Sequence, residues 1–364
     1  MPRKSEEVFS DFRITIGGKE QRDLVNDLIR VEVEDSVDCP SMFNLTLADG
    51  EGSWLDSPLL NPEIGGDIKI YLGYADEDLN PVHPLITGKI VALNPSFPME
   101  GVQTLAVQGY DHSFFLQKTH SIEKSMALNG QDLSVLVSRI AQANRLIPKV
   151  DNAGIQYSNV IFGDIGESDY SFIKKIADMV GFEFFVRDKM LYFKAPGYSN
   201  TAGTLSWGVD IYSMNFRMST ARAAKKAKVL AFNCDDQKIY KSEKDKGKFK
   251  FFDGIYASKY LNASEFHSEI QEKNSILSCQ KDADVLGGAL IDKANNSFVE
   301  GSCEISGDPK IKAGLSIKIE GAGRRLSGKY YIKSARHSIG KGGYLLNLDL
   351  MSMVTQKVSN KIIR

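Results

Sequence analysis

An alternation of apolar and polar side chains runs through the first third of the chain and limits what it can fold into. In the stretch DIKIYLGY, residues 67–74, every second position is apolar: Ile68, Ile70, Leu72 and Tyr74. This period of two is typical of a β-strand with one buried face. Four further segments alternate in the same way: 28–35, 43–49, 85–93 and 101–111. Short strands at such close spacing predict a small antiparallel barrel or sandwich.

Helical spacing replaces the alternation near residue 120. Four apolar residues share one face of a first predicted helix: Leu133, Leu136, Val137 and Ile140. A second helix is expected after Ser168, whose hydroxyl can accept from a free backbone amide, and before Gly181, which tolerates a left-handed conformation. Two strands follow, joined at residues 187–189. The segment 119–200 is therefore expected to form a compact α+β unit between β-rich segments.

The last third of the chain returns to strand patterns, beginning with residues 206–219 and 224–235. The lysine-rich segment 238–250 predicts an exposed hairpin or a mobile loop. Residues 279–297 are a helix candidate in which two adjacent glycines, Gly287 and Gly288, each cost about 1 kcal/mol relative to alanine, so a close backbone contact is expected there. Four closing strands are predicted: 298–306, 314–321, 328–339 and 343–352.

Length, charge and cysteine content exclude several classes of protein. The 364 residues suffice for two or three domains, and the net charge of −1 gives no overall basic field for nucleic acid. The four cysteines lie far apart, without metal-site or disulfide spacing, and are expected to be reduced. No apolar run reaches the ~18 residues that span a bilayer, and none resembles a signal peptide. We expect synthesis in the cytoplasm and no membrane insertion.

Motifs for catalysis or cofactor binding are not found in the sequence. The five histidines lack zinc-site spacings, and no GxSxG motif of a serine hydrolase occurs. Cys279 and His267 could form a nucleophile pair only if the fold brought them together. The glycine clusters at 321–325 and 340–344 lie between strands and are interpreted as hairpin turns. No catalytic, cofactor-binding or metal-binding residue is therefore predicted, and no cofactor is expected.

Two alternative functions stay open from the residues alone. A hydrolase such as a glycosidase needs only two carboxylates about 5–10 Å apart in a cleft, and 46 acidic residues are too many to single out a pair. A nucleic-acid-binding module could use the basic region 222–250, whose lysines could contact phosphates. A solvated loop or a protein interface explains this charge run better.

The stretch FGDIGESDYSFIKKIADMVGFEFFVRDKMLYF, residues 162–193, resembles the hallmark of the late control protein D family of contractile-tailed phages. Type VI secretion spike proteins share it: an ESDxxFIxRL-like helix precedes a strand with glycine-aromatic-x-aromatic spacing. Eight positions match: Glu167, Ser168, Asp169, Phe172, Ile173, Gly181, Phe182 and Phe184. Residues 174–176 depart mildly, since the family more often has an arginine and a leucine there.

The closing strands are similar to those of the same family. Residues 307–321, 326–339 and 342–350 match its glycine- and proline-containing turn and the strands that follow, and His337 falls on the histidine of the family. The resemblance covers about residues 8–352 and is poorest at 236–278, which looks specific to this protein.

The resemblance implies the hub of a baseplate, the structural and non-enzymatic centre of a contractile injection machine such as a phage tail, a tailocin or an extracellular injection system. The fold class would be α+β, mainly β, with two small tube-like antiparallel β-barrel domains flanking an inserted α+β domain. The domains would comprise residues 1–118 with 201–233, the insertion 119–200, and residues 234–364, the last with a lysine-rich insertion at 236–278. The helix and strand of 166–185 would then form the core of the inserted domain.

Three such chains would form a pseudo-sixfold ring with a central channel, because each chain supplies two similar barrels. This homotrimer would act as a symmetry adaptor that joins the hexameric inner tube, or a tube-initiator protein, to the trimeric spike. Further partners would be baseplate wedge components and cargo in the lumen, all within a virion or injection particle. Only a dozen residues follow residue 352, so the spike needle and any wall-degrading enzyme are expected on separate polypeptides. The interface residues are not assigned by the sequence.

Overall fold

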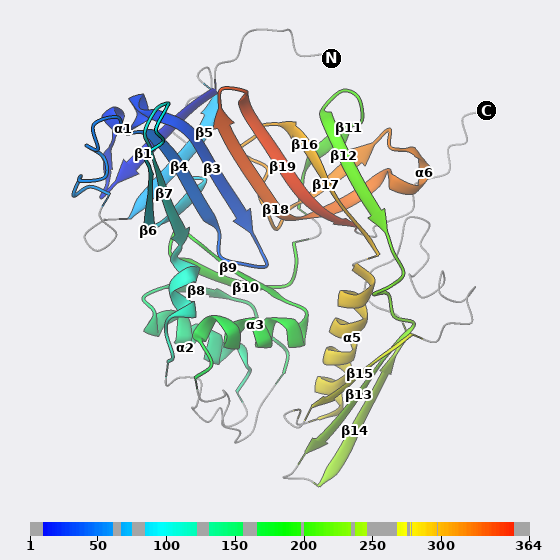
Figure 1. The fold of residues 1–364 in the computed structure, drawn as a ribbon. Coiled ribbons are helices and arrows are strands. Elements are labelled where there is room, and N and C mark those ends of the chain that lie inside the picture. The colour runs from blue at the N-terminus through cyan, green and yellow to red at the C-terminus, as the bar shows by residue number, and fades with distance from the viewer. Residues whose placement is uncertain are drawn as a thin grey trace.

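The computed structural model of the chain describes residues 10–60, 67–74, 84–121, 131–155, 166–197, 200–233, 237–245, 268–274, 277, 279–296 and 298–352. Strands dominate it, and thirteen of them form one large, mainly antiparallel sheet. Figure 1 shows this sheet above two smaller units, each with a three-stranded sheet and helices. The mainly β class that the alternation predicts is therefore confirmed.

Seven strands of the large sheet come from the N-terminal segment: β1 (Ser10–Ile16), β2 (Lys19–Glu20), β3 (Leu28–Ser36), β4 (Met42–Ala48), β5 (Ile68–Tyr74), β6 (Ile86–Ser96) and β7 (Thr104–Asp111). A short helix, α1 (Arg22–Asn26), links β2 to β3. All five strands expected from the alternation are present. Their alternate residues bury a first core that includes Ile14, Leu45, Ile70 and Val107.

Six further strands come from the C-terminal half: β11 (Thr201–Ser206), β12 (Ile211–Met218), β16 (Val299–Ser306), β17 (Ser316–Glu320), β18 (Gly328–Gly340) and β19 (Gly343–Ser352). A single helical turn, α6 (Gly323–Leu326), follows β17. These strands bury a second core that is separate from the first and includes Val299, Ile317, Ile332 and Leu348.

One pairing joins the two groups of strands into a single sheet. β3 lies antiparallel to β18, from Val31 opposite Ile339 to Ser36 opposite Ser334. The strand order is β12-β16-β19-β18-β3-β4-β7-β6-β5-β1-β2, with β17 beside β18 and β11 beside β17. The two cores therefore lie behind two halves of one continuous sheet.

The pairing of β11 and β12 differs from the expected grouping of residues 201–233 with the first β-domain. β12 pairs with β16, and β11 pairs with β17, both of the C-terminal group. The reason is the packing of β12, whose Met214 and Phe216 lie against the second core. Residues 226–233 belong to neither group, because they form a strand of a separate small sheet.

Between the two groups of strands the chain builds a smaller unit, which we call the insert. Its elements are η1 (His112–Gln117), α2 (Ser134–Ala143), β8 (Ile147–Val150), α3 (Asp169–Val180), β9 (Glu183–Arg187) and β10 (Met190–Lys194). β10 pairs with β8 in parallel and with β9 in antiparallel orientation. Asp188 and Lys189 join β9 to β10 with φ of 48° and 63°. Positive φ at both residues is typical of the two-residue hairpin turn whose backbone twist matches that of the flanking strands.

Helix α3 has the ends that the sequence predicts. The backbone N–H of Ser171 donates to Oγ of Ser168 at 3.2 Å, and Gly181 ends the helix with φ of 70°. Phe172 and Ile173 are fully buried in a core shared by α2, α3 and the strands of the insert. The aromatic and aliphatic residues of this stretch therefore serve packing, as expected.

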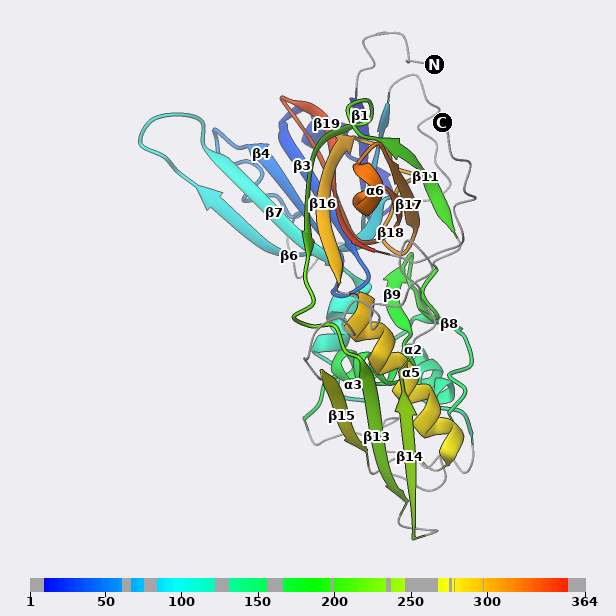
Figure 2. The same cartoon turned by 90° about the vertical axis from the view of Figure 1, so that its right-hand side faces the viewer.

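The second small unit, which we call the arm, comprises β13 (Lys226–Asn233), β14 (Lys238–Lys244), β15 (Glu269–Asn274) and α5 (Gln280–Asn296). β13 lies between β14 and β15, and α5 packs against β13 and β14 beside the insert (Figures 1 and 2). A Cβ on Gly287 would lie 3.1 Å from Oγ of Ser242, which confirms the expected close contact at this glycine. A Cβ on Gly288 would have no neighbouring atom within 4 Å, because this glycine borders a hollow towards the insert.

Candidate functional site

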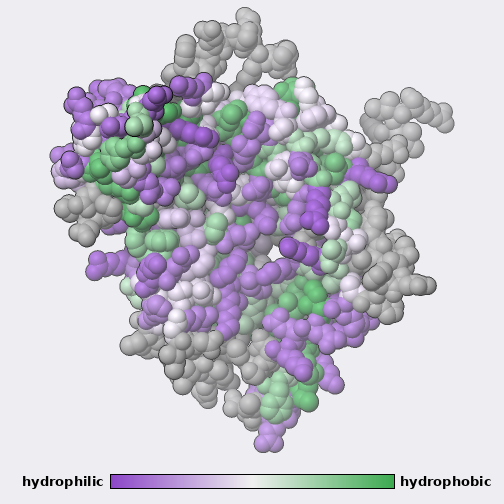
Figure 3. Space-filling model, viewed as in Figure 1, coloured by the Kyte–Doolittle hydropathy of each residue, from purple (hydrophilic) through white to green (hydrophobic). Residues whose placement is uncertain are grey.

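A continuous polar surface covers the side of the large sheet that is turned away from its two cores. It is built by alternate positions of seven strands: Asn215, Arg217, Glu300, Ser302, Glu304, Asn347, Asp349, Ser334, Arg336, Glu32, Glu34, Asn44 and Gln108. Figure 3 shows hydrophilic residues gathered over β3, β18 and β19 in this view. We call this surface the polar face.

The strand register places these side chains in rows across the sheet. One row contains Asn215, Ser302, Asp349, Ser334 and Ser36. The next contains Ser213, Glu304, Asn347, Arg336 and Glu34. Both rows cross the pairing of β3 with β18, so the two halves of the sheet contribute to a single surface.

Charges of opposite sign lie beside one another on the polar face. Arg217 is directly opposite Glu300 across β12 and β16. The guanidinium of Arg336 donates to the carboxylate of Glu34 at 2.7 Å. Exposed pairs of this kind add little stability, but they neutralise the surface locally. The polar face therefore carries both signs of charge, with five carboxylates against two guanidiniums among its members, and it includes no large exposed apolar side chain.

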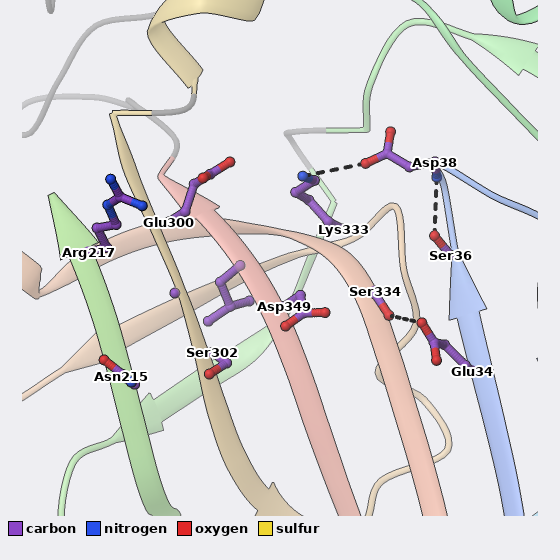
Figure 4. A pocket seen from close by; sticks show the side chains of 12 residues that line it. Glu34, Ser36, Asp38, Asn215, Arg217, Glu300, Ser302, Lys333, Ser334 and Asp349 are labelled. Atoms are coloured by element: carbon purple, nitrogen blue, oxygen red, sulfur yellow. Dashed lines mark hydrogen bonds and ion pairs between the residues drawn. The ribbon is translucent and has the colours of Figure 1, made fainter. Parts of the chain in front are cut away.

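Near β12 the polar face is hollowed, with a volume of about 530 Å³ (Figure 4). Figure 4 shows Arg217, Glu300 and Asp349 on neighbouring strands, with Lys333 and Asp38 at the upper rim. Nζ of Lys333 lies 3.5 Å from the carboxylate of Asp38. Acidic and basic side chains are intermixed in this hollow. It therefore does not present two isolated carboxylates facing each other, as a glycoside hydrolase requires.

A larger hollow of about 910 Å³ lies where the insert, the arm and the large sheet meet. The hydroxyl of Tyr331 in β18 donates to Oε1 of Glu183 in β9, while Oε2 is buried and has no hydrogen-bond partner within the described residues. Burial raises the pKa of Glu183 to about 7. Lys293 of α5 pairs with Asp178 of α3 at 2.9 Å across the same junction. These contacts connect the three parts of the chain.

Asp111 is a second carboxyl with a raised pKa, and its hydrogen bonds hold backbone segments in place. Burial raises the pKa of Asp111 to about 6. Its carboxylate accepts from the backbone N–H of Ser41 at 3.0 Å and of Ser113 at 2.8 Å, so it fixes the start of η1 and the turn before β4. Asp111 and Glu183 are thus engaged by neighbouring groups rather than presented together in one cleft.

The histidine and cysteine residues form no metal or nucleophile site in the part of the chain that the structure describes. No group of three or more metal-binding side chains occurs there. His337 is fully buried, with Nδ1 2.8 Å from the hydroxyl of Tyr344, and burial lowers its pKa to about 3. Cys279 is half-buried, and its conceivable partner His267 lies outside the described residues. No helix among the described residues is both long and apolar enough to cross a bilayer.

The basic region 222–250 is neutralised in part where it is described. Three of its lysines form ion pairs with acids: Lys226 with Glu243 at 2.5 Å, Lys228 with Glu269 at 2.7 Å and Lys244 with Asp284 at 2.9 Å. The aromatic residues Phe249 and those following lie outside the described residues. Paired lysines on a sheet are poor ligands for phosphate, because binding would first break the existing pairs.

The fold is similar to that of solved tail proteins. Three solved structures resemble the chain: the 43 kDa tail protein of prophage MuSo2 from Shewanella oneidensis, a tail protein from Neisseria meningitidis MC58, and the E. coli c3393 protein, a type VI secretion component described as similar to the T4 bacteriophage tail proteins gp27 and gp5.

The first two structures each have a TM-score of 0.69, and they are 14% and 13% identical to this chain. Each match covers 94% of this chain, with 100% of the Shewanella protein and 97% of the Neisseria protein. For the E. coli protein the TM-score is 0.51 at 13% identity, over 95% of this chain and 77% of that one. The resemblance to hub proteins noted in the sequence is therefore confirmed for the fold.

The family model described as the Alg8 N-terminal domain matches residues 6–341, so the chain belongs to that family. No curated protein matches the sequence significantly.

Proposed function

We propose that this chain is the structural hub of a contractile injection machine, where three copies form a ring that joins the hexameric inner tube to the trimeric spike. The observation that carries the proposal is the polar face, which extends without interruption across both halves of the sheet. A polar surface with an acidic excess suits a channel lining, because apolar cargo does not adhere to it and acidic cargo is not attracted to it.

The two separate cores support the proposed pair of tube-like barrels. One core lies behind the N-terminal strands and the other behind the C-terminal strands, while β3 and β18 unite them. Two similar halves in each of three chains would offer six similar positions to a hexameric tube and three to a spike. The insert and the arm both lie below the sheet (Figure 1), where they would brace the ring from outside.

The likeness of the fold to phage tail proteins and a type VI secretion component favours the same setting for this chain. The partners would be a second and third copy, the inner tube or a tube initiator, the spike and baseplate wedge proteins, with cargo in the lumen. We propose no enzymatic activity. The protein would act as part of a virion or injection particle.

The mass of the purified chain in solution, with negative-stain images of the same fraction, tests this proposal. Light scattering should give roughly 121 kDa, three times the chain mass of 40.3 kDa, and the images should show rings with a central hole. A monomer that stays monomeric when the spike and tube proteins of the same particle are added would contradict the proposal. Hydrolysis of cell-wall material by the same fraction would favour the alternative of a tail-associated hydrolase.

A further inference from the structure

The hollow where the insert, the arm and the large sheet meet has the size of a ligand pocket, and we call it the junction hollow. Its volume of about 910 Å³ lies within the range of about 300–1,000 Å³ that is typical of sites for small organic molecules. Apolar side chains from all three parts of the chain contribute to its wall: Val37, Val180, Phe182, Val285, Ala289 and Met351. The junction hollow can therefore enclose an apolar group.

Gly288 keeps one wall of the junction hollow open. It lies in the interior of α5, where a glycine costs about 1 kcal/mol relative to alanine. A Cβ on Gly287 would lie 3.1 Å from Oγ of Ser242, whereas a Cβ on Gly288 would have no neighbouring atom within 4 Å. Packing among the described residues thus gives a reason for glycine at position 287 but not at 288. A molecule bound in the hollow would supply the reason at 288.

Glu183 lines the junction hollow with a carboxyl group that is only half used. Its Oε1 accepts from the hydroxyl of Tyr331. Its Oε2 is buried and has no hydrogen-bond partner within the described residues. A buried acceptor without a donor is unfavourable, so a donor that enters the hollow would satisfy this oxygen.

The lysines around the junction hollow are engaged by acids other than Glu183. Nζ of Lys174 lies 3.5 Å from the carboxylate of Asp38, and Nζ of Lys293 lies 2.9 Å from that of Asp178. Among the described residues no lysine forms an ion pair with Glu183, and Lys174 acts on it only at longer range. In the described lining six acidic residues stand against five basic ones. Charge complementarity therefore favours a cationic donor beside Glu183.

We propose that the junction hollow binds a small organic ligand that combines an apolar body with one primary ammonium group. The apolar body would occupy the space beside Val285 and Gly288, and the ammonium would donate to Oε2 of Glu183. Such a ligand would contact the insert, the arm and the large sheet at once, and would thereby stabilise their junction. The inference concerns a single chain and goes beyond the proposed hub function, on which it does not depend.

Isothermal titration calorimetry of the full chain with phenethylamine tests the inference. The matched probes are 2-phenylethanol, which lacks the charge, and 3-phenylpropanoate, which reverses it. We expect phenethylamine to bind once per chain and about tenfold or more tightly than the alcohol, because a hydrogen bond between charged groups adds roughly this much. The carboxylate should not bind. Phenethylamine should also raise the melting temperature.

Two variants and one control place the binding in the junction hollow. Glu183→Gln should weaken the binding of phenethylamine about tenfold or more and leave that of 2-phenylethanol unchanged. Gly288→Leu should abolish the binding of both probes by filling the space, without a loss of stability, since leucine is the better helix former. Glu304→Gln on the polar face is the control for the loss of a carboxylate, and should bind like the wild type.

Three results would overturn the inference. Phenethylamine might show no binding to the wild type at its highest soluble concentration, or it and the alcohol could bind equally well. Binding of phenethylamine that persists in both Glu183→Gln and Gly288→Leu would place the site elsewhere. None of these results affects the hub proposal, which the mass of the assembly tests. A chain that binds phenethylamine but never assembles with its spike and tube proteins would contradict the hub proposal alone.

Discussion

The guanidinium of Arg187 in β9 donates to the carboxylate of Asp35 in β3 at 2.7 Å, although 152 residues separate them. The same guanidinium donates to the backbone oxygen of Ala313 at 2.8 Å, and the N–H of Ala313 donates to Asp35 at 3.0 Å. One arginine therefore ties the insert to the first group of strands and to the segment before β17.

Replacing Arg187 with alanine should lower the free energy of unfolding by about 2–3 kcal/mol, because it leaves the nearly buried carboxylate of Asp35 without its charged partner. Urea unfolding monitored by circular dichroism measures the change. Arg22→Ala is the matched control, since the pair of Arg22 with Glu20 is largely exposed and should contribute less than 1 kcal/mol, roughly. Equal effects of the two substitutions would contradict this reading of the junction.

Phe172 tests the role of the helix that carries the family resemblance. Its side chain is fully buried in the core of the insert, so Phe172→Ala should cost about 3–5 kcal/mol through lost burial and a residual cavity. The truncation of an exposed apolar residue of the same unit, Ile147→Ala, should cost little. A small effect at Phe172, measured by the same urea titration, would mean that this helix contributes a surface rather than a core.

Local structure was predictable from the sequence because its signals are local. The cap at Ser168, the end at Gly181 and the period of two in β5 each depend on residues within one turn or one strand. Partners far apart in the sequence leave no such mark. The pairing of β3 with β18 was therefore not expected, nor was the packing of β12 beside β16.

The polar face illustrates the same limit for the candidate site. Its members were visible as polar positions within strands, such as Ser302 and Glu304, or Asn347 and Asp349. Whether they form one surface depends on strand order and register, because a shift by one residue would turn them to the other side of the sheet. The bond between Arg187 and Asp35 was hidden for the same reason, as it joins elements whose contact only the tertiary fold creates.

The junction at Glu183 should make stability depend on pH. Burial raises the pKa of this carboxyl from 4.5 to about 7, while the hydrogen bond from Tyr331 and the charges of Lys194 and Lys174 oppose that rise. The folded protein therefore holds the proton more tightly than the unfolded chain, and its stability should fall as pH rises from about 4.5 to about 7.

The variant Glu183→Gln isolates this effect, because its amide resembles the protonated acid. Its free energy of unfolding, relative to that of the wild type, should increase between pH 4.5 and 7 and stay constant above pH 7. Thermal unfolding at closely spaced pH values provides the measurement. Parallel profiles for the two proteins would show that Glu183 has the same pKa in the folded and unfolded states.

His337 should act in the opposite direction on the acidic side. Burial, and then the positive charge of Lys312, lower its pKa to about 3. The unfolded chain therefore takes up this proton first, and stability should be lost as pH falls from about 6.5 towards 3. In a background of Glu183→Gln, the further substitution His337→Gln should flatten that loss while lowering stability at neutral pH, since the contact with Tyr344 is also altered. An unchanged slope on the acidic side would contradict the lowered pKa.

The central claim is that the polar face lines the channel of a ring formed by three chains. Electron cryomicroscopy of the assembled protein, at a resolution that traces the strands, tests it most directly. We predict three chains around one axis, with Glu34, Arg336 and Asp349 turned towards the central channel and the insert and arm outside. A ring with these residues on its outer surface, or an assembly without a channel, would contradict the account.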